Sequence, residues 1–181
     1  TFDGYQAPSI LQVPGAKTVT VEFNTLSKSH NMAGWRTGVA VGYHQAIKQL
    51  HDLKTNVDSG HFLPVMEASA AALHGDQAWL VDRNLVYQQR RDSVVMSLQQ
   101  MGLNPGVSKA SLYVWCPIPD GWGSGELAAM LLEDAGISLT PGDIFGSHGE
   151  GYIRISLTVP QARIDEAMQR MDAALQVSGR N

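Results

Sequence analysis

A lysine and an arginine occur together in one short stretch of the sequence, residues 24–38. Lys28 lies between two serines, and Arg36 follows eight residues later between Gly34 and Gly38. No other lysine or arginine occurs between positions 18 and 47. Two cations on a segment rich in hydroxyls and glycines indicate a site that receives an anion. A desolvated lysine can also lose its proton and attack a carbonyl carbon.

The hydroxyls near Lys28 indicate which kind of anion the segment could bind. Thr25 and Ser27 precede the lysine by three residues and one residue, and together with Arg36 they could converge on a phosphate. Arginine suits phosphate because its planar fork forms paired, charge-assisted hydrogen bonds. On spacing alone, however, a single lysine in a loop is more often a solvated surface residue.

Arg154 is a second candidate for anion binding. It is at the centre of an alternating run, residues 152–157, with Ile153 and Ile155 on the face opposite to its own. Two interpretations are equally open from the residues. The arginine pairs with an acidic residue on a solvent face, or it is a fixed guanidinium that receives a substrate carboxylate.

Alternating and helical spacings of apolar residues predict the elements that position these side chains. The segments 18–23 and 36–42 should be strands on either side of the lysine loop, followed by a helix at 44–53, a loop at 55–60 and a buried helix at 62–73. The longest helical pattern runs from 76 to 101, and its three arginines (Arg83, Arg90 and Arg91) are predicted to form a solvated face. From residue 111 onward, the order strand, helix, strand, strand, helix indicates a small α+β layer.

Composition excludes several classes of protein. The 181 residues are 44% hydrophobic and 17% charged, with a net charge of −4, which is typical of a soluble globular chain and unlike a nucleic-acid-binding surface. No apolar run approaches the roughly 20 residues needed to span a bilayer. The spacing of the six histidines suits no common metal site. One cysteine, Cys116, cannot form an internal disulfide, so we expect a packing role for it and a reducing, cytoplasmic location for the protein.

The stretch around the lysine closely resembles the cofactor-lysine motif of class I/II aminotransferases, which are pyridoxal-phosphate enzymes of fold type I. The motif is Thr-Leu-Ser-Lys at 25–28, followed at eight residues by Arg36. Two further stretches agree with the family in the same order: Pro-Gly-Asp-Ile-Phe-Gly at 141–146 and Gly-Glu-Gly-Tyr-Ile-Arg-Ile-Ser-Leu at 149–157. The lysine stretch is similar to the branch that contains LL-diaminopimelate aminotransferases and aspartate- or alanine-type aminotransferases.

The resemblance implies a role for each candidate. Lys28 would bind pyridoxal 5′-phosphate covalently and carry the proton between the substrate Cα and the cofactor. Thr25, Ser27 and Arg36 would bind the cofactor phosphate, with Thr25 replacing the family's usual serine. Arg154 would bind the α-carboxylate of the amino acid. The implied activity is transfer of an amino group between an amino acid and a 2-oxo acid, and no metal is implied.

The same resemblance implies that the chain is the C-terminal half of the family fold. Residues 1–75 would be the end of the large cofactor-binding domain, and 76–181 the long connecting helix and the small α+β domain. The family's aspartate and tyrosine that contact the pyridine ring would precede the chain, since Asp3 and Tyr5 have the wrong spacing. We therefore expect the chain alone to be poorly active.

Two alternatives to an aminotransferase remain open at the level of the sequence. A carbon–sulfur lyase or another fold type I enzyme would share the lysine and both arginines. A non-catalytic half would serve only to assemble with a partner.

In the family the active site lies at a homodimer interface, so a homodimer is expected, with a contact across it near residues 55–60. Neither nucleic acid nor membrane is an expected partner.

Overall fold

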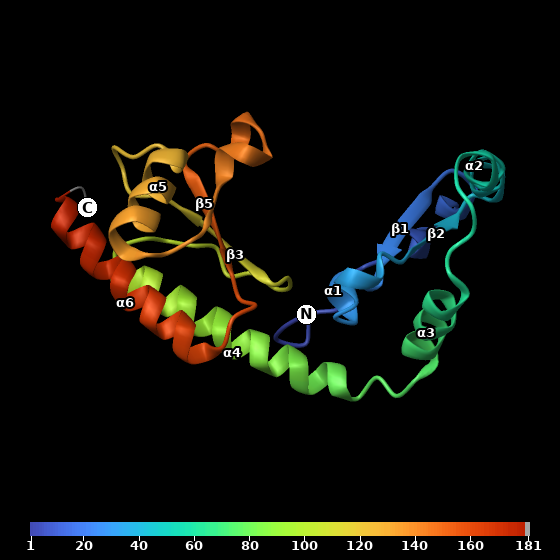
Figure 1. The fold of residues 1–181 in the computed structure, drawn as a ribbon, viewed down its shortest axis with the longest axis horizontal. Helices are drawn as coiled ribbons and strands as arrows, with labels where there is room; N and C mark the ends of the chain where they lie inside the picture. The colour runs from blue at the N-terminus through green and yellow to red at the C-terminus, as the bar shows by residue number, and fades with distance from the viewer. Residues whose placement is uncertain (180–181) are drawn as a thin grey trace. The chain divides into compact units, whose positions relative to one another are not determined.

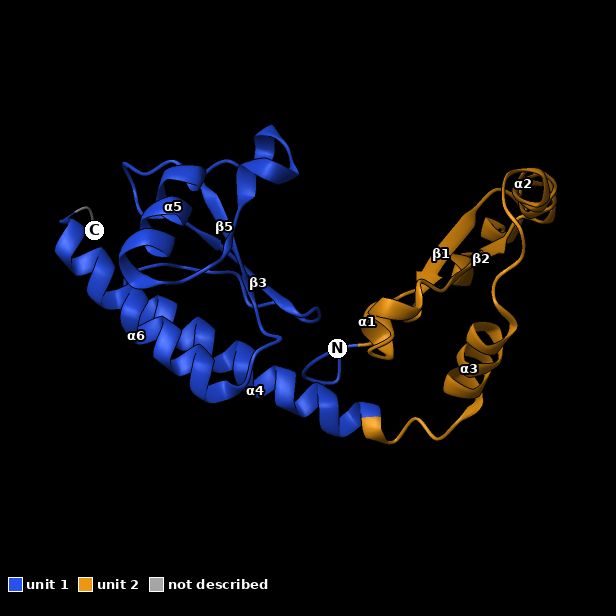
Figure 2. Cartoon of the chain, viewed as in Figure 1, with its two compact units in different colours: residues 1–5, 80–181 blue, residues 6–79 orange. Residues whose placement is uncertain are grey.

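The computed structural model describes residues 1–179, which form two compact units. Unit 1 consists of Thr1–Tyr5 and Leu80–Asn181, and unit 2 consists of Gln6–Trp79 (Figure 2). The contacts thus divide the chain between Trp79 and Leu80, and they also assign the first five residues to unit 1. No helix among the described residues is long and apolar enough to cross a bilayer.

Unit 2 is built on a hairpin of two antiparallel strands, β1 (Val21–Thr25) and β2 (Gly38–Gly42) (Figure 1). Gly42 has a φ of +135°, and a Cβ at this position would lie 2.1 Å from the carbonyl oxygen of Thr20, so only glycine fits. The other elements are helical: η1 (Ile10–Gln12), η2 (Ala16–Thr18), α1 (Leu26–Ser29), η3 (Ala33–Trp35), α2 (His44–Val57) and α3 (Leu63–His74).

Three expectations for unit 2 differ from the structure. The strand expected at 18–23 begins and ends later, because Thr18 belongs to the turn η2. Residues 55–57 of the expected loop continue α2 as helix. The helix expected at 62–73 forms, but it is not buried, since Met66 is 53% exposed and Leu73 is 51% exposed. Its small apolar residues favour burial, yet nothing described in unit 2 covers most of them.

Unit 1 combines a three-stranded antiparallel sheet with three long helices. The strand order is β3-β5-β4, with β3 at Tyr113–Pro117, β4 at Thr140–Pro141 and β5 at Tyr152–Ser156. The long helices are α4 (Trp79–Gln100), α5 (Ser124–Ala135) and α6 (Gln161–Ser178), and the short turns η4 (Gly142–Phe145) and η5 (Ser147–Gly149) precede β5. The order of elements after residue 111 agrees with the small α+β layer expected from the sequence, although the short strand expected at 137–139 lies at β4 instead.

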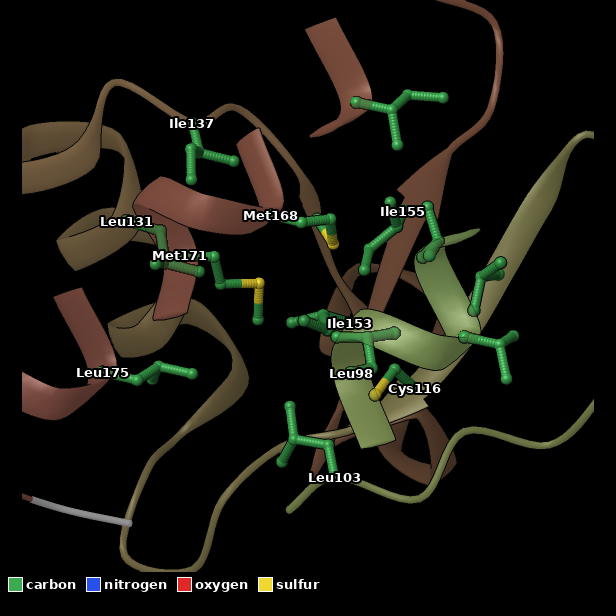
Figure 3. Packing of buried hydrophobic residues seen from close by; sticks show 14 of the residues in the cluster. Leu98, Leu103, Cys116, Leu131, Ile137, Ile153, Ile155, Met168, Met171 and Leu175 are labelled. Carbon is green, nitrogen blue, oxygen red and sulfur yellow. The ribbon is translucent and has the colours of Figure 1, made fainter. Parts of the chain in front are cut away.

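The hydrophobic core of unit 1 is formed by one sheet face and by α4, α5 and α6. Figure 3 shows Leu98 of α4, Cys116 of β3 and Ile153 of β5 converging on the same region. Alternate residues of β3 and β5 are buried, as an amphipathic sheet requires. This cluster contains no residue of unit 2.

The arginines of α4 do not form the solvated face expected from the sequence. Arg91 is 3% exposed and is ion-paired with Asp3 at 2.8 Å and with Asp92 at 2.7 Å. Its guanidinium also donates to the Ser108 carbonyl and lies 4.8 Å from the centre of the Phe2 ring. The prediction was wrong for Arg91 because residues distant in sequence cover this side of the helix and supply the counter-charge that a buried cation requires.

Cys116 packs in the core as a free thiol, which confirms the expected packing role. Burial raises its pKa to about 12. The ordinary pKa of a thiol is about 8.5. Between these values the unfolded chain loses a proton that the folded chain keeps, so the free energy of unfolding falls as the pH rises.

We expect this loss of stability to reach about 1.4 kcal/mol per pH unit between about pH 9 and pH 12. Urea unfolding of the wild-type chain and of Cys116→Ala across this range measures it. Other groups that titrate at alkaline pH affect both proteins equally, so their contributions cancel in the difference between the two free energies of unfolding. An unchanged difference from pH 8 to pH 11 would show that Cys116 titrates normally in the folded state.

Candidate active site

The hairpin of unit 2 closes the loop that carries Lys28 and Arg36. Thr25 at the end of β1 pairs with Gly38 at the start of β2, so both cations belong to the segment between paired strand ends. A Cβ at Gly38 would lie 2.8 Å from the Asn24 carbonyl oxygen, which requires glycine at this close approach. The local sequence therefore places the two cations on one loop with fixed ends.

Two hydroxyls lie together where the lysine turn begins. Thr25 is the N-cap residue of α1, and its hydroxyl oxygen accepts from the Ser27 backbone N–H at 3.2 Å. The same oxygen lies 2.9 Å from Ser27 Oγ and donates to the Thr37 carbonyl at 2.9 Å. Thr25 and Ser27 are thus brought together, and Lys28 follows directly, exposed on α1.

Arg36 ends the same loop in an unusual backbone conformation. Its φ and ψ are 52° and 44°, in the left-handed region that non-glycine residues rarely occupy. Nη1 donates to the Ala33 carbonyl at 3.1 Å, and the Arg36 carbonyl lies 3.1 Å from Nε2 of His61. Among residues 1–179, no carboxylate forms an ion pair with Arg36. The exposed guanidinium therefore has no anionic partner in the described chain.

Two residues that follow the hairpin in sequence, Ser69 and Gln77, support the loop, although no sequence motif predicts their role. His30 lies 2.9 Å from Ser29 Oγ through Nδ1 and 3.0 Å from Gln77 Oε1 through Nε2. The hydroxyl of Ser69, on α3, lies 3.2 Å from the Thr37 hydroxyl and donates to the Val65 carbonyl at 2.7 Å. No local spacing signals the contacts of Gln77 with His30 and of Ser69 with Thr37, because the partners lie more than thirty residues apart.

Arg154 lies in unit 1, on β5, and is half-buried. Its Cζ is 4.2 Å from the ring centre of Tyr113 and 4.7 Å from that of Phe145, and Nη2 donates to Thr140 Oγ1 at 3.4 Å. No ion pair to Arg154 occurs within the described residues, which is unlike a strand arginine paired with an acidic residue. Four of the five candidate residues thus share one loop of unit 2, and Arg154 belongs to the other unit.

Comparison with known proteins identifies the family. The model of the family "Aminotransferase class I and II" matches residues 3–171. The chain belongs to this family. Enzymes of the class I and II aminotransferase family generally depend on pyridoxal phosphate.

The relatives of this aminotransferase chain agree along nearly its whole length. LL-diaminopimelate aminotransferase of Moorella thermoacetica is 47% identical over 97% of this chain, which covers 45% of that relative. LL-diaminopimelate aminotransferase 2 of a Nostoc species is 49% identical over 96% of this chain and 44% of the relative. The chain thus spans less than half the length of these curated relatives.

Solved structures confirm the expected fold class, the C-terminal half of a fold type I aminotransferase. The aromatic aminotransferase from Pyrococcus horikoshii matches with a TM-score of 0.94 and 28% identity, over 99% of this chain and 49% of that chain. A probable N-succinyldiaminopimelate aminotransferase from Thermus thermophilus matches with a TM-score of 0.90 and 34% identity.

Proposed function

We propose that this chain is the lysine- and arginine-bearing portion of an enzyme that transfers the amino group of LL-diaminopimelate to a 2-oxo acid, using pyridoxal 5′-phosphate. The observation that carries this proposal is the closed hairpin loop on which Thr25, Ser27, Lys28 and Arg36 lie together. The relatives named LL-diaminopimelate aminotransferase, which are 44–49% identical, support the choice of substrate.

The residues of the loop fit the cofactor. Two adjacent hydroxyls and a guanidinium match a phosphate monoester, and a primary amine matches an aldehyde. The stretch 24–38 contains no acidic residue, and the nearby Glu22 carboxylate is bound by the Ser9 hydroxyl and the Ile10 backbone N–H. An anion bound at the loop is therefore not repelled by any carboxylate of the stretch 24–38.

The proposed mechanism assigns a separate task to each residue. Thr25, Ser27 and Arg36 bind the phosphate and fix the position of the cofactor. Lys28 Nζ would hold the cofactor covalently and, as a free amine once the substrate amine has taken its place, would move a proton from the substrate Cα. Arg154 binds the α-carboxylate through charge-assisted hydrogen bonds and so orients the Cα–H bond. The cofactor, when bound, supplies the electron sink for the developing carbanion.

The remaining assignments are proposals of the same kind. Residues 1–75 would belong to the large cofactor-binding domain, and 76–181 would form the connecting helix and the small domain. The division of contacts at Trp79 supports this boundary. We further propose a homodimer, on the basis of the family resemblance, and a cytoplasmic location, which is consistent with a single free cysteine.

An assay of amino transfer tests the proposed function. The intact enzyme that contains this chain should convert LL-diaminopimelate only when pyridoxal phosphate and an acceptor such as 2-oxoglutarate, oxaloacetate or pyruvate are present. The 181-residue chain alone should turn over poorly or not at all, because the resemblance implies that the family's aspartate for the pyridine nitrogen is not among these residues. Keto acid released without any acceptor would instead indicate a lyase, and absence of turnover by the intact enzyme would support the assembly role.

A further inference from the structure

Aromatic side chains gather around Arg154 on the sheet face that is turned away from the core of unit 1. In the register of the sheet, Trp115 is paired with Arg154. Tyr113 and Tyr152 lie two residues from this pair on their own strands, so all four side chains share a face. Phe145, from η4, contacts the same group.

Two of these rings pack against the guanidinium itself. The distance from Arg154 Cζ to the ring centre is 4.2 Å for Tyr113 and 4.7 Å for Phe145. Both lie within the range of a cation–π contact, which extends to about 6 Å. One further contact, the hydrogen bond from Nη2 to Thr140, restrains rotation of the group.

The remaining rings hold Phe145 in place. Trp115 meets Phe145 edge to face, with centres 5.8 Å apart and planes at 67°. Trp115 also stacks on Tyr152, with ring centres 5.4 Å apart and planes at 17°. Phe145 is itself 52% exposed, so this ring is retained at the surface by contact with Trp115 and Arg154 and not by burial.

A restrained guanidinium is suited to binding a carboxylate. A free arginine side chain carries about 2 kcal/mol of rotamer entropy, part of which is lost on binding. Rings packed against the guanidinium remove that freedom beforehand and limit the directions from which a carboxylate can approach. Bidentate pairing requires approach along an edge of the planar group.

We propose that Tyr113 and Phe145 are positioning residues that hold the Arg154 guanidinium oriented for the substrate carboxylate. This inference rests on the proposed function of Arg154. The proposed role concerns a substrate that carries a carboxylate. Neither ring is proposed to contact the cofactor.

Steady-state kinetics of the intact enzyme test the proposal. Phe145→Leu should raise KM for the amino acid about tenfold and change kcat less than twofold, because the ring acts through Arg154 in binding. Phe145→Tyr, which keeps a ring, should restore KM to within twofold of wild type. Ile144→Ala is the matched control, since Ile144 is the exposed neighbour in the same turn and should leave KM unchanged.

A parallel variant separates this proposal from the proposed function. If Arg154→Gln raises KM but Phe145→Leu does not, the positioning role is wrong while the carboxylate-binding role stands. If Arg154→Gln leaves KM unchanged, the proposed role of Arg154 itself is wrong. Tyr113→Leu replaces Phe145→Leu if the latter does not fold.

A spectroscopic readout needs no variant and no activity. In the ¹⁵N–¹H spectrum of the wild-type chain, the Arg154 Nε–H should be shifted by the neighbouring ring currents from the position of the exposed Arg163. A signal at the averaged position of a freely rotating arginine would overturn the proposal.

Discussion

Replacing Lys28 with alanine is expected to lower the turnover of the intact enzyme by about 10³-fold or more, because the proposed mechanism uses Lys28 both for covalent attachment of the cofactor and as the proton carrier. Lys28→Arg should be equally inactive. Arginine keeps the positive charge, but it remains protonated and cannot condense with an aldehyde. Charge alone is therefore not sufficient at this position.

Lys17→Ala is the matched control for the Lys28 variants. Lys17 is an exposed lysine of the same unit, in the turn η2, and its loss should leave turnover within twofold of wild type. Borohydride reduction in the presence of pyridoxal phosphate, followed by peptide mass spectrometry, should place the adduct on Lys28. An adduct on another lysine, or a Lys28→Ala enzyme within tenfold of wild type, would refute the assignment.

Hydrogen exchange of the 181-residue chain is expected to differ sharply between the two units. Amides of the core elements of unit 1 should exchange roughly a thousandfold more slowly than those of unit 2. The reason is burial. Unit 1 contains a continuous core, whereas only Ala16, Leu26, Met32 and Ser69 are buried in unit 2.

The packing of unit 2 shows why its protection should be low. Its sheet has only two strands, which are marginally stable in isolation, and Phe23 on β1 is 72% exposed. Cavities of about 450 Å³ and 360 Å³ remain where the hairpin approaches α3. Most of the apolar surface that would stabilise these elements is in contact with solvent.

Two helices of equal length, one from each unit, allow a direct comparison of hydrogen exchange. Helices α3 and α5 both contain 12 residues, with one buried residue in α3 and three in α5. Mass spectrometry of their peptides should show fast exchange in α3 and slow exchange in α5. In the intact enzyme, α3 should become protected. Equal protection of the two helices in the 181-residue chain would show that unit 2 is stable without further partners.

Local sequence determined most of the lysine site. Lys28, Arg36 and the two hydroxyls lie within one short segment, and the β-branched runs on either side form the hairpin that closes it. Strand alternation likewise placed Arg154 opposite the buried face of β5. These features depend on the order of neighbouring residues, which the sequence displays directly.

Tertiary structure decided the surroundings of the same residues. Arg91 is buried because Asp3 and Ser108 reach it from distant segments, and Arg154 is held by rings from β3 and η4. Conversely, α3 has the composition of a buried helix but is exposed because nothing in its unit covers it. Helical and strand periods specify which face is apolar, but only the packing of distant segments determines what that face meets.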